Sequence, residues 1–538
     1  YDASQQKVLL VYRDQSNSNQ GEFVFATPSA NGEALTFTTP ALFYEDAVSG
    51  IGQSISAVYD PDSEKSVVAY RKPNLEGAAK TIFNEPGGKV KAIAETAVSQ
   101  AAGTPVEISG SFLINFGAAY DSANQKVVVV YRDVTNNSYA TAAVATVDNS
   151  DNSVSFGTPV VFNSGTTTQL GASYDTNAGK IVAVYRDFGN SQYGTAIVGT
   201  VSGTSISFGS EAVYNSATSE ENHIVYDSTA QKHVIVYQVG TDLAAIVGTV
   251  SGTSISFGSE AIVSANAAYG VPDVVYDSGN DKTVVFYADN GDSQKGKAKV
   301  GTVSGTSISF GTAAEFEGGT TLRISAAYDS SAGKVVVAYK DSGDSDKGKA
   351  AVGTVSGTGI SFGTPVVFES GAIGETTTSY DASTSKIVIA YEDDDNSDYG
   401  TVIAGAVSGT SITFETALVI ENSATDEFGS VYDANAERVV IFYEDEGDSN
   451  KGKSVVFQAA STTTDLTTEN YIGITDQAYT DGQDATIAVV GCIDRNQTGL
   501  TAGQQYFVQK DGTLALTAAT PSVLAGTAIS ATELVVKE

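Results

Sequence analysis

Residues 328–339 read YDSSAGKVVVAY, which is a Tyr-Asp pair, four residues, a lysine, four apolar residues and a second tyrosine. The same spacing, with Lys or Arg as the base, occurs nine times along the 538-residue chain. The first tyrosines of the copies are Tyr1, Tyr59, Tyr120, Tyr174, Tyr226, Tyr276, Tyr328, Tyr380 and Tyr432, most of them 50 to 54 residues apart. A period in this range is typical of repeat architectures. Because nine copies of one unit would not each be an active site, the repeat predicts a scaffold.

The seventh unit predicts four antiparallel strands joined by polar turns. The expected strands are residues 323–329, the continuous apolar run 334–339, residues 350–355 and residues 360–368. Ser356-Gly357-Thr358 provides a tight turn between the last two strands. No segment of the unit has helical periodicity. The fold class is therefore all-β.

The inner strand of the unit is apolar throughout, which indicates that both faces of each sheet are covered. Radial stacking of four-stranded sheets into a β-propeller meets that need, whereas β-solenoid coils are shorter and sandwiches require more strands. Units three to nine, about residues 114–458, are regular and would form seven blades, while nine blades exceed the usual number. We expect about eight blades (seven to nine), with a split blade joining the two ends of the repeat region.

The repeats define a first domain over residues 1–460. Residues 461–470 are rich in Ser, Thr and acids and are expected to be a linker. Residues 471–538 carry a hairpin signal at Asp511-Gly512 and predict a small β-barrel or sandwich. A domain of this size without a disulfide is expected to dock or oligomerise.

The composition limits the partners of the chain. The formal net charge is −34, from 63 acids and 29 bases, which disfavours nucleic acid and anionic membranes. The single cysteine, Cys492, excludes an intrachain disulfide, and no apolar run approaches the length of a membrane helix. The chain contains no Met, so we expect further residues upstream of Tyr1.

The repeated Tyr-Asp…Lys…Tyr residues have a structural interpretation and a functional one. The Asp and the Lys bracket a hairpin and are expected to form a cross-strand charge pair worth about 0.2–1 kcal/mol. The tyrosines are expected to bury their rings between sheets and to keep their hydroxyls bonded. As a functional alternative, the same rings could serve as nine ligand platforms.

The loop after the second tyrosine follows the pattern Asp-x-x-[Asp/Asn]-Ser-x-x-Gly in several units and becomes more acidic in the later ones. Oxygen-rich side chains at such intervals could bind Ca²⁺, which takes six to eight oxygen ligands. The candidate ligands are Asp341, Asp344, Asp346, Asp393, Asp395 and Asp398. The same residue types also build a long hairpin turn without an ion. No other cofactor is expected.

The residue after the second tyrosine changes along the chain. It is Arg13, Arg71, Arg132 and Arg186 in units one to four, then Gln238, Ala288, Lys340, Glu392 and Glu444. Equivalent positions of a propeller lie on one ring, so this drift predicts a basic arc and an acidic arc. The arginines could bind a carboxylate or an acidic sugar through bidentate contacts. Alternatively, they are inherited surface charges that pair with nearby acids.

The sequence gives little support to catalysis. The two histidines, His223 and His233, flank one hairpin and lack the further ligands of a metal set. Phosphate-binding loops, Cys-x-x-Cys pairs and the motifs that accompany a Ser-His-Asp set are not found. Paired carboxylates of a glycosidase are compatible with the acid content, but no motif marks them.

Two stretches resemble structural proteins of marine bacteriophages, especially tail-fibre and other virion appendage proteins. The first is the repeat core YRD…YGTAIVGTVSGTSISFG over residues 185–209, and the second consists of GLTAGQQYFV at 499–508, DGTL at 511–514 and PSVLAGTAISATELVV at 521–536. The motif GLTxGxxY also echoes fibronectin-type domains. The resemblance implies a non-enzymatic component of the virion surface that contacts a host-surface glycan or receptor.

The same resemblance implies partners and leaves alternatives. The C-terminal domain would bind other virion proteins, and the chain would form a homo-oligomer or part of an assembly, without nucleic acid or membrane insertion. One alternative is a secreted or cell-surface adhesin with a lectin-like propeller. Another is a glycan hydrolase on a propeller scaffold.

Overall fold

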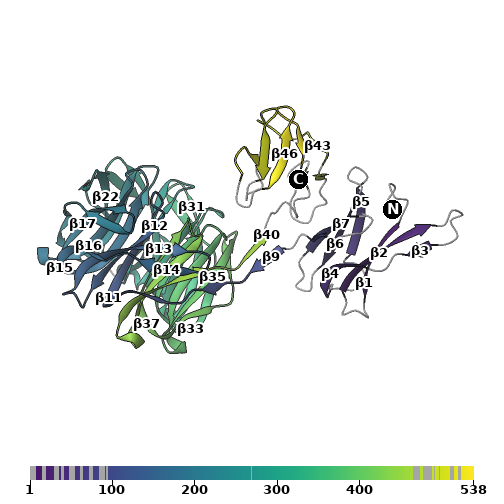
Figure 1. Ribbon diagram of the computed structural model, residues 1–538. Helices are drawn as coiled ribbons and strands as arrows, with labels where there is room; N and C mark the ends of the chain where they lie inside the picture. Colours follow the sequence, from purple (N-terminus) through teal and green to yellow (C-terminus); the bar gives the residue numbers. More distant parts are fainter. Residues whose placement is uncertain are drawn as a thin grey trace. The chain divides into compact units, whose positions relative to one another are not determined.

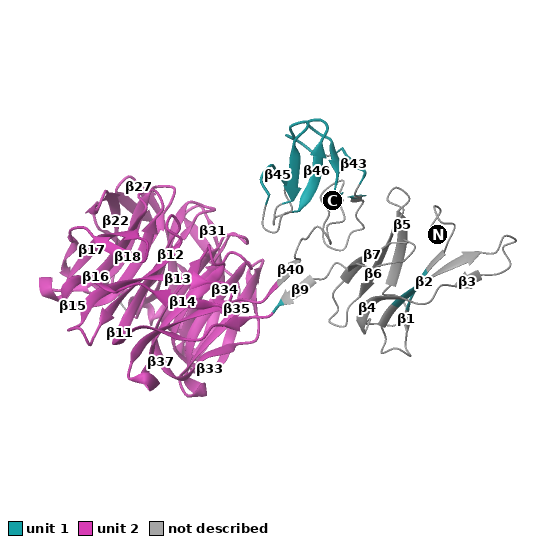
Figure 2. Ribbon diagram, viewed as in Figure 1, with its two compact units in different colours: residues 1–98, 462–538 teal, residues 99–461 magenta. Residues whose placement is uncertain are grey.

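The computed structural model describes residues 95–464 apart from 268–269, together with single strands between residues 8 and 92 and parts of residues 473–537 (Figure 1). The chain divides into two compact units, residues 99–461 and residues 1–98 with 462–538 (Figure 2). The described part contains no helix that is long and apolar enough to cross a membrane.

Residues 99–461 fold into seven four-stranded antiparallel sheets, which we call blades 1 to 7. Their inner strands contact one another in a closed ring, so the unit is a β-propeller. The inner strands of blades 1 to 7 belong to β11 (Val106–Asp121), β15 (Val160–Asp175), β20 (Glu220–Asp227), β25 (Asp273–Asp277), β29 (Ala314–Asp329), β33 (Val366–Asp381) and β37 (Leu418–Asp433). The predicted fold class is confirmed, with seven blades where about eight (seven to nine) were expected.

The second and third strands of each blade form a hairpin. The second strands are β12 (Lys126–Asp133), β16 (Lys180–Asp187), β21 (Lys232–Val239), β26 (Lys282–Asp289), β30 (Lys334–Asp341), β34 (Lys386–Asp393) and β38 (Arg438–Asp445). The third strands are β13 (Tyr139–Asp148), β17 (Tyr193–Ser202), β22 (Asp242–Ser251), β27 (Lys295–Ser304), β31 (Lys347–Ser356), β35 (Tyr399–Ser408) and β39 (Lys451–Gln458). In five blades a 3₁₀ turn joins the two: η1 (Phe188–Asn190), η2 (Asn290–Asp292), η3 (Ser342–Asp344), η4 (Asp394–Asn396) and η5 (Glu446–Asp448).

The fourth strand of each blade is made of short pieces. Four-residue strands pair with the end of the third strand in blades 1 to 6: β14 (Ser153–Phe156), β18 (Ser205–Phe208), β23 (Ser254–Phe257), β28 (Ser307–Phe310), β32 (Gly359–Phe362) and β36 (Ser411–Phe414). The start of the next long strand then completes the outer edge, so that the 16-residue β15 is outer in blade 1 and inner in blade 2. In blades 2 and 3 the outer piece is the separate strand β19 (Ala212–Thr218) or β24 (Ala261–Ser264).

The ring is closed by strand pairing between its first and last segments. β10 (Ala101–Ala102) and the start of β11 pair with β39 and supply the outer edge of blade 7. This pairing is a split blade, as the sequence predicts, but it joins residues 101–112 to the last unit, where the start of the repeat region was expected. The propeller therefore lies within residues 99–461, where residues 1–460 were expected, because the ring closes without the first two repeats.

The first two repeats form two separate sheets. One contains β1 (Val8–Asp14), β2 (Gln20–Pro28), β3 (Leu35–Phe37) and β4 (Ala41–Ala47). The other contains β5 (Ile55–Asp60), β6 (Lys65–Arg71), β7 (Gly77–Phe83) and β8 (Lys91–Ala92).

The C-terminal part is also a β structure. Its five-stranded sheet contains β43 (Ile493–Asp494), β44 (Gln505–Val508), β45 (Leu514–Ala515), β46 (Leu524–Ala528) and β47 (Leu534–Val536), and β41 (Gly473–Thr475) pairs with β42 (Ile487–Val489). β44 pairs with β45, as the hairpin signal predicts, although residues 509–513 lie outside the described ones. Within the expected linker, β40 (Ser461–Thr464) pairs with β9 (Glu95–Val98).

The core lies between neighbouring blades. Val335, Val337 and Tyr339 of β30 pack with Phe286 and Val300 of blade 4. Side chains on both faces of β30 are buried, as the continuous apolar run predicts. In each of the seven blades, the second tyrosine of the repeat is almost fully buried. The repeat therefore encodes the surfaces through which blades stack.

The repeated Asp has a different role from the one expected. Asp329 and Lys334 are cross-strand neighbours as predicted, but no ion pair joins them within the described residues. Instead, Asp329 Oδ1 accepts hydrogen bonds from the backbone N–H groups of Ser331 and Ala332, both at 2.9 Å. The Tyr380 hydroxyl of the next blade accepts a bond from the same Ser331 N–H at 3.3 Å. The Tyr-Asp pair thus shapes the turn and ties neighbouring blades together.

Candidate ligand-binding site in the central channel

Each inner strand except β25 has a break in register near the ring axis. In blade 1 the register shifts between Ile114 and Gly117, and equivalent shifts occur in blades 2, 3, 5, 6 and 7. Such a bulge redirects a side chain out of the regular alternation of the strand. Each shift spans two residues, and one of them lies five positions before a first tyrosine. These six residues all line the central cavity: Asn115, Gln169, Glu221, Arg323, Glu375 and Glu427.

Five of these residues have a left-handed backbone. The φ angles are 55° at Asn115 and Gln169, 48° at Glu221 and Arg323, and 53° at Glu427. For side chains such as Glu and Arg this conformation is unfavourable by roughly 1–2 kcal/mol. Strained residues of this kind cluster at functional sites. The five strained residues therefore indicate that the cavity, which they line together with Glu375, is a functional site.

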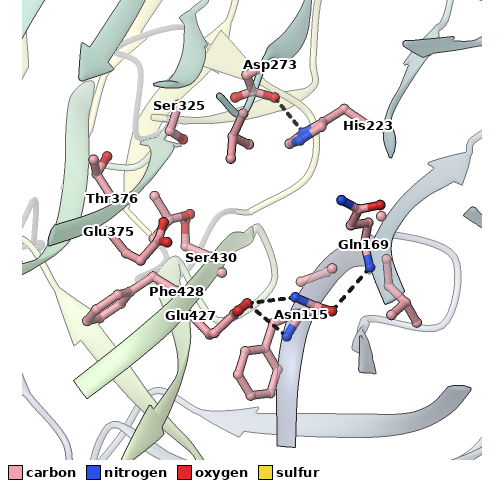
Figure 3. A pocket seen from close by; sticks show the side chains of 18 of the residues that line it. Asn115, Gln169, His223, Asp273, Ser325, Glu375, Thr376, Glu427, Phe428 and Ser430 are labelled. Atoms are coloured by element: carbon pink, nitrogen blue, oxygen red, sulfur yellow. Dashed lines mark hydrogen bonds and ion pairs between the residues drawn. The ribbon is translucent and has the colours of Figure 1, made fainter. Parts of the chain in front are cut away.

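The cavity occupies the ring axis and has a volume of about 420 Å³. Figure 3 shows the labelled side chains around it, with His223 and Asp273 on one side and Asn115 and Glu427 on another. Hydroxyls of Ser325, Thr376 and Ser430 add to its wall, as do two phenylalanines, Phe116 and Phe428. The cavity combines hydrogen-bonding groups with apolar patches, as ligand sites do.

Four of the polar side chains form one hydrogen-bonded arc across blades 7, 1, 2 and 3. Asn115 donates to Glu427 Oε2 from its backbone N at 3.1 Å and from Nδ2 at 2.9 Å. The Gln169 backbone N donates to Asn115 Oδ1 at 3.2 Å, and Gln169 Nε2 donates to Glu221 Oε1 at 2.9 Å. Each end of the arc is therefore a glutamate whose hydrogen bonds, within the described residues, come from neutral amides.

The remaining charged side chains pair with each other. His223 Nδ1 lies 3.4 Å from Asp273 Oδ1, and Arg323 Nη1 forms an ion pair with Glu375 Oε1. Asp273 also accepts bonds from the backbone N–H groups of Ala326 and Val274, both at 2.7 Å. These contacts connect blades 3 and 4, 4 and 5, and 5 and 6 around the other side of the cavity.

Burial shifts the protonation of the cavity acids. Loss of solvent raises the pKa of Glu375 to about 8. The positive charge of Arg323 lowers this pKa in part, and the negative charge of Glu427 raises it further. Burial likewise raises the pKa of Glu221 and of Glu427 above the ordinary value. For His223, burial opposes the charged form, but the hydrogen bond and charge of Asp273 outweigh it and raise the pKa. The acids are therefore held in a poorly solvated setting.

The described arginines of the predicted basic arc, Arg132 and Arg186, do not line this cavity. Arg132 pairs across the sheet with Ile114 and donates to Ser138 Oγ at 3.0 Å. Arg186 Nη1 lies 3.1 Å from Glu220 Oε1, and its guanidinium stacks 4.7 Å from the Phe188 ring centre. Arg186 thus pairs with an acid, as the surface-pair interpretation expects, whereas the bond of Arg132 is to a serine hydroxyl; ligand binding by the arginines stays a prediction. The side chains of Arg13 and Arg71 lie outside the described residues.

The predicted calcium loop of blade 5 contains a lysine between its carboxylates. Lys349 Nζ lies 2.6 Å from Asp341 Oδ2 and 2.9 Å from Asp344 Oδ2. Asp341 Oδ1 also accepts a bond from Gly343 N at 2.9 Å, and Asp346 accepts one from Ser342 Oγ at 2.6 Å. In this loop an internal ammonium supplies the positive charge, and the Asp residues serve the turn.

Blade 6 has Thr401 at the position of that lysine. Here Glu392, Asp394 and Asp398 bring carboxylate oxygens within 4.8 Å of one another, whereas Asp393 and Asp395 are not part of the group. Burial, with the nearby charge of Glu369, raises the pKa of Asp393 to about 6. Calcium binding stays a prediction, and its candidate ligands here are only partly the ones that the sequence indicates.

The two histidines do not meet across their hairpin. His223 faces the cavity, whereas His233 is buried between blades 2 and 3. His233 Nδ1 lies 2.8 Å from Ser173 Oγ, and its Nε2 lies 3.5 Å from Asp175 Oδ2. Burial lowers the pKa of His233 despite Asp175. The sequence indicates only that the two histidines lack the further ligands of a metal set; it does not indicate that His223 lines the cavity.

Sequence reasoning also missed the six bulge residues, although the repeat contains a signal for them. Each lies five positions before a first tyrosine, as Glu427 does before Tyr432 and Asn115 before Tyr120. Blade 4 has Val271 at this position. The aligned repeat position, which we call the column, is therefore polar in six of the seven blades.

No family model and no curated protein matches the chain. Among solved structures, the chain resembles the BP39L lectin from Burkholderia pseudomallei with 11% identity and a TM-score of 0.47, over 65% of this chain and 96% of that one. A mutant of the NanB sialidase from Streptococcus pneumoniae is similar with 8% identity and a TM-score of 0.39, over 84% and 92%. Sqt1 from Saccharomyces cerevisiae has 10% identity and a TM-score of 0.40, over 67% and 100%. At these values the likenesses carry no argument about ligand or activity.

Proposed function

We propose that the chain is a non-enzymatic binding protein that takes part of a glycan into the central cavity of its propeller. The observation that carries this proposal is the cavity itself, with a volume of about 420 Å³ and polar side chains supplied by all seven blades. Ligand pockets typically measure about 300–1,000 Å³.

The chemistry of the lining suits sugar hydroxyls. Amide and hydroxyl groups, here from Asn115, Gln169, Ser325 and Thr376, can both donate and accept hydrogen bonds, and carboxylates accept them. Phe116 and Phe428 offer apolar surface for the carbon face of a sugar ring. Such a mixture favours a polyhydroxylated ligand over an apolar one.

One set of residues that resembles the catalytic residues of a serine hydrolase is inaccessible to substrate. The Ser173–His233–Asp175 contact resembles a catalytic set in composition, but His233 is 0% exposed and Ser173 only 9%. Substrate does not reach a serine enclosed in this way. A glycan hydrolase remains the alternative function. It is tested by incubating the protein with each bound glycan and measuring reducing ends; their release would favour a hydrolase over a binding protein.

The location of the protein is proposed from the phage-like sequence stretches. They support a virion appendage or surface component, in which the C-terminal domain attaches to other virion proteins. A secreted or cell-surface adhesin is the alternative setting for the same cavity. Proteomics of purified particles from the source, compared with the particle-free supernatant, separates the two: absence from the particles would reject the virion role.

A glycan panel tests the binding function. We expect the wild-type protein to retain a subset of glycans, and Ser430→Phe, which places a ring in the cavity, to abolish that retention. Val419→Phe is the matched control because Val419 is 42% exposed on the outer edge of blade 6. Retention that survives Ser430→Phe in a folded protein would place binding elsewhere.

A further inference from the structure

The charges of the central cavity are unbalanced. Four carboxylates, from Glu221, Asp273, Glu375 and Glu427, face one guanidinium and one imidazole. Asp273 is paired with His223, and Glu375 with Arg323. Within the described residues, Glu221 and Glu427 form no ion pair.

These two glutamates are the ends of the hydrogen-bonded arc. Glu221 accepts a bond from Gln169, and Glu427 accepts two from Asn115, in each case on one carboxylate oxygen. Neutral amides orient a carboxylate but bring no counter-charge to it, and the attraction of Arg323 for both groups is smaller than the effect of burial. A buried charge without a counter-charge is unfavourable, and burial raises the pKa of both groups accordingly.

Elsewhere in the propeller, the charges of neighbouring acids are neutralised by a lysine of the same blade. In blades 4, 5 and 7, a lysine ammonium lies between two aspartates, as Lys297 does with Asp289 at 2.8 Å and Asp292 at 2.7 Å. In the cavity, the six bulge positions include a single cation, Arg323, whose partner is Glu375. Arg323 acts on Glu221 and Glu427, and His223 on Glu221, only through longer-range attraction, so within the described residues neither glutamate has a cation in direct contact, and a ligand can supply one.

We infer that the ligand of the central cavity is an amino sugar with a free ammonium group, which pairs with Glu221 or Glu427 while its hydroxyls bond the amides and the Ser and Thr hydroxyls. This inference rests on the proposed glycan-binding function and specifies its ligand. Charge-assisted hydrogen bonds from an ammonium to a carboxylate are roughly twice as strong as neutral ones. N-acetylation of the sugar removes that charge and adds bulk at the same atom.

Isothermal titration of the full chain tests this inference at pH 7. The probes are a glucosamine tetramer, its fully N-acetylated counterpart and cellotetraose, which has neither amine nor acetamide. We expect the glucosamine tetramer to bind at least tenfold more tightly than the other two. We also expect its affinity to fall as the salt concentration rises, because the added contact is between charges.

Two variants locate the contact. Glu427→Gln and Glu221→Gln keep the shape of the side chain and remove its charge, so at least one of them should lower the affinity for the glucosamine tetramer tenfold or more. Either substitution should lower the affinity for the glucosamine tetramer by a larger factor than the affinity for a neutral tetramer, because only the amino sugar loses a charge-assisted contact. The matched control is Glu107→Gln, because Glu107 pairs with Lys451 on the outer edge of blade 7.

The outcomes are distinguishable. Equal affinity of the wild-type protein for the amino and the N-acetylated tetramers would overturn the amino-sugar inference and leave glycan binding in place. No binding of any tetramer, by a protein whose cooperative thermal unfolding shows that it is folded, would overturn both. A parallel titration with CaCl₂ is a further test. Calcium binding that Glu427→Gln abolishes would contradict the amino-sugar inference, because the cation that pairs with Glu427 would then be a metal ion. The comparison of tetramers on wild-type protein decides the inference even if a variant fails to fold.

Discussion

Asn115 and Glu427 lie 312 residues apart in the chain and are joined by two hydrogen bonds to one carboxylate oxygen, at 2.9 Å and 3.1 Å. Asn115 belongs to the first blade and Glu427 to the last, so the contact spans the point where the ring closes. It also forms one side of the central cavity. One pair of residues thus connects the closure of the fold to the site.

Replacing Asn115 with Ala should destabilise the propeller, because Glu427 then loses a donor in a poorly solvated position. We expect a loss of about 1–3 kcal/mol in the free energy of unfolding, measured by denaturant titration. Asn422→Ala is the control, since Asn422 is exposed on the outer part of β37. Equal stability of the two variants would contradict the role of this contact.

The stability of the protein should decrease as the pH rises from 5.5 to 8.5. Burial raises the pKa of Glu375 to about 8 from an ordinary value of 4.5, and raises that of Glu392 and of Glu444 to about 7. Between pH 4.5 and 8 the folded chain therefore binds protons that the unfolded chain has released, so unfolding is favoured as protons are withdrawn.

The measurement is the melting temperature across this pH range, with Glu375→Gln as the test variant. The variant should show a shallower decline, because its side chain stays neutral throughout. A melting temperature that rises with pH in the wild-type protein would show that the cavity acid is ionised in the folded state.

The buried tyrosine of one blade bonds to the outer strand of the blade before it. Tyr339 of blade 5 donates its hydroxyl hydrogen to Glu317 Oε2 at 2.8 Å, from a side chain that is 0% exposed. We expect Tyr339→Phe to lower the free energy of unfolding by about 1–3 kcal/mol, since Glu317 loses its buried donor. For Tyr287 of blade 4, the corresponding residue on the outer strand of blade 3 is Ser264, so Tyr287→Phe should have the smaller effect. The reverse order would reject the tyrosine–glutamate contact as a stabilising feature.

The strand that closes the ring should contribute as much to the stability of the propeller as a strand inside a blade. Ile108 is 4% exposed and packs against Val440 and Phe442 of blade 7. Ile108→Ala is expected to cost about 2–5 kcal/mol, as for a core residue, whereas Val161→Ala at a 42% exposed position should have little effect. A near-neutral Ile108→Ala would indicate that residues 101–112 do not close the ring in solution.

The repeat spacing alone predicted the fold class, the four-stranded unit and the closure by a split blade. These follow from the regular alternation of apolar runs such as residues 334–339 with turns such as Ser356-Gly357-Thr358, where Gly357 adopts a φ of 62°. The number of blades did not follow, because Tyr1 and Tyr59 carry the same signature as the tyrosines within the ring. Which repeats join a ring depends on edge pairing between distant strands, such as Val106 with Ser454.

The candidate site was hidden for a related reason. The conspicuous repeat residues do not line the cavity: Arg132 bonds Ser138, and Asp341 pairs with Lys349 in a turn. The cavity residues lie in the column five positions before the first tyrosine, where no two neighbouring units carry the same amino acid except Glu375 and Glu427. Only the bulges in the inner strands turn that variable column toward the axis.

The most direct test of the central claim is a crystal structure of the full chain with the glucosamine tetramer. We predict electron density for a sugar residue in the cavity on the ring axis, with its ammonium nitrogen within hydrogen-bonding distance of Glu221 or Glu427. A tetramer bound between blades or on the outer loops, with the central cavity filled only by water, would contradict the account.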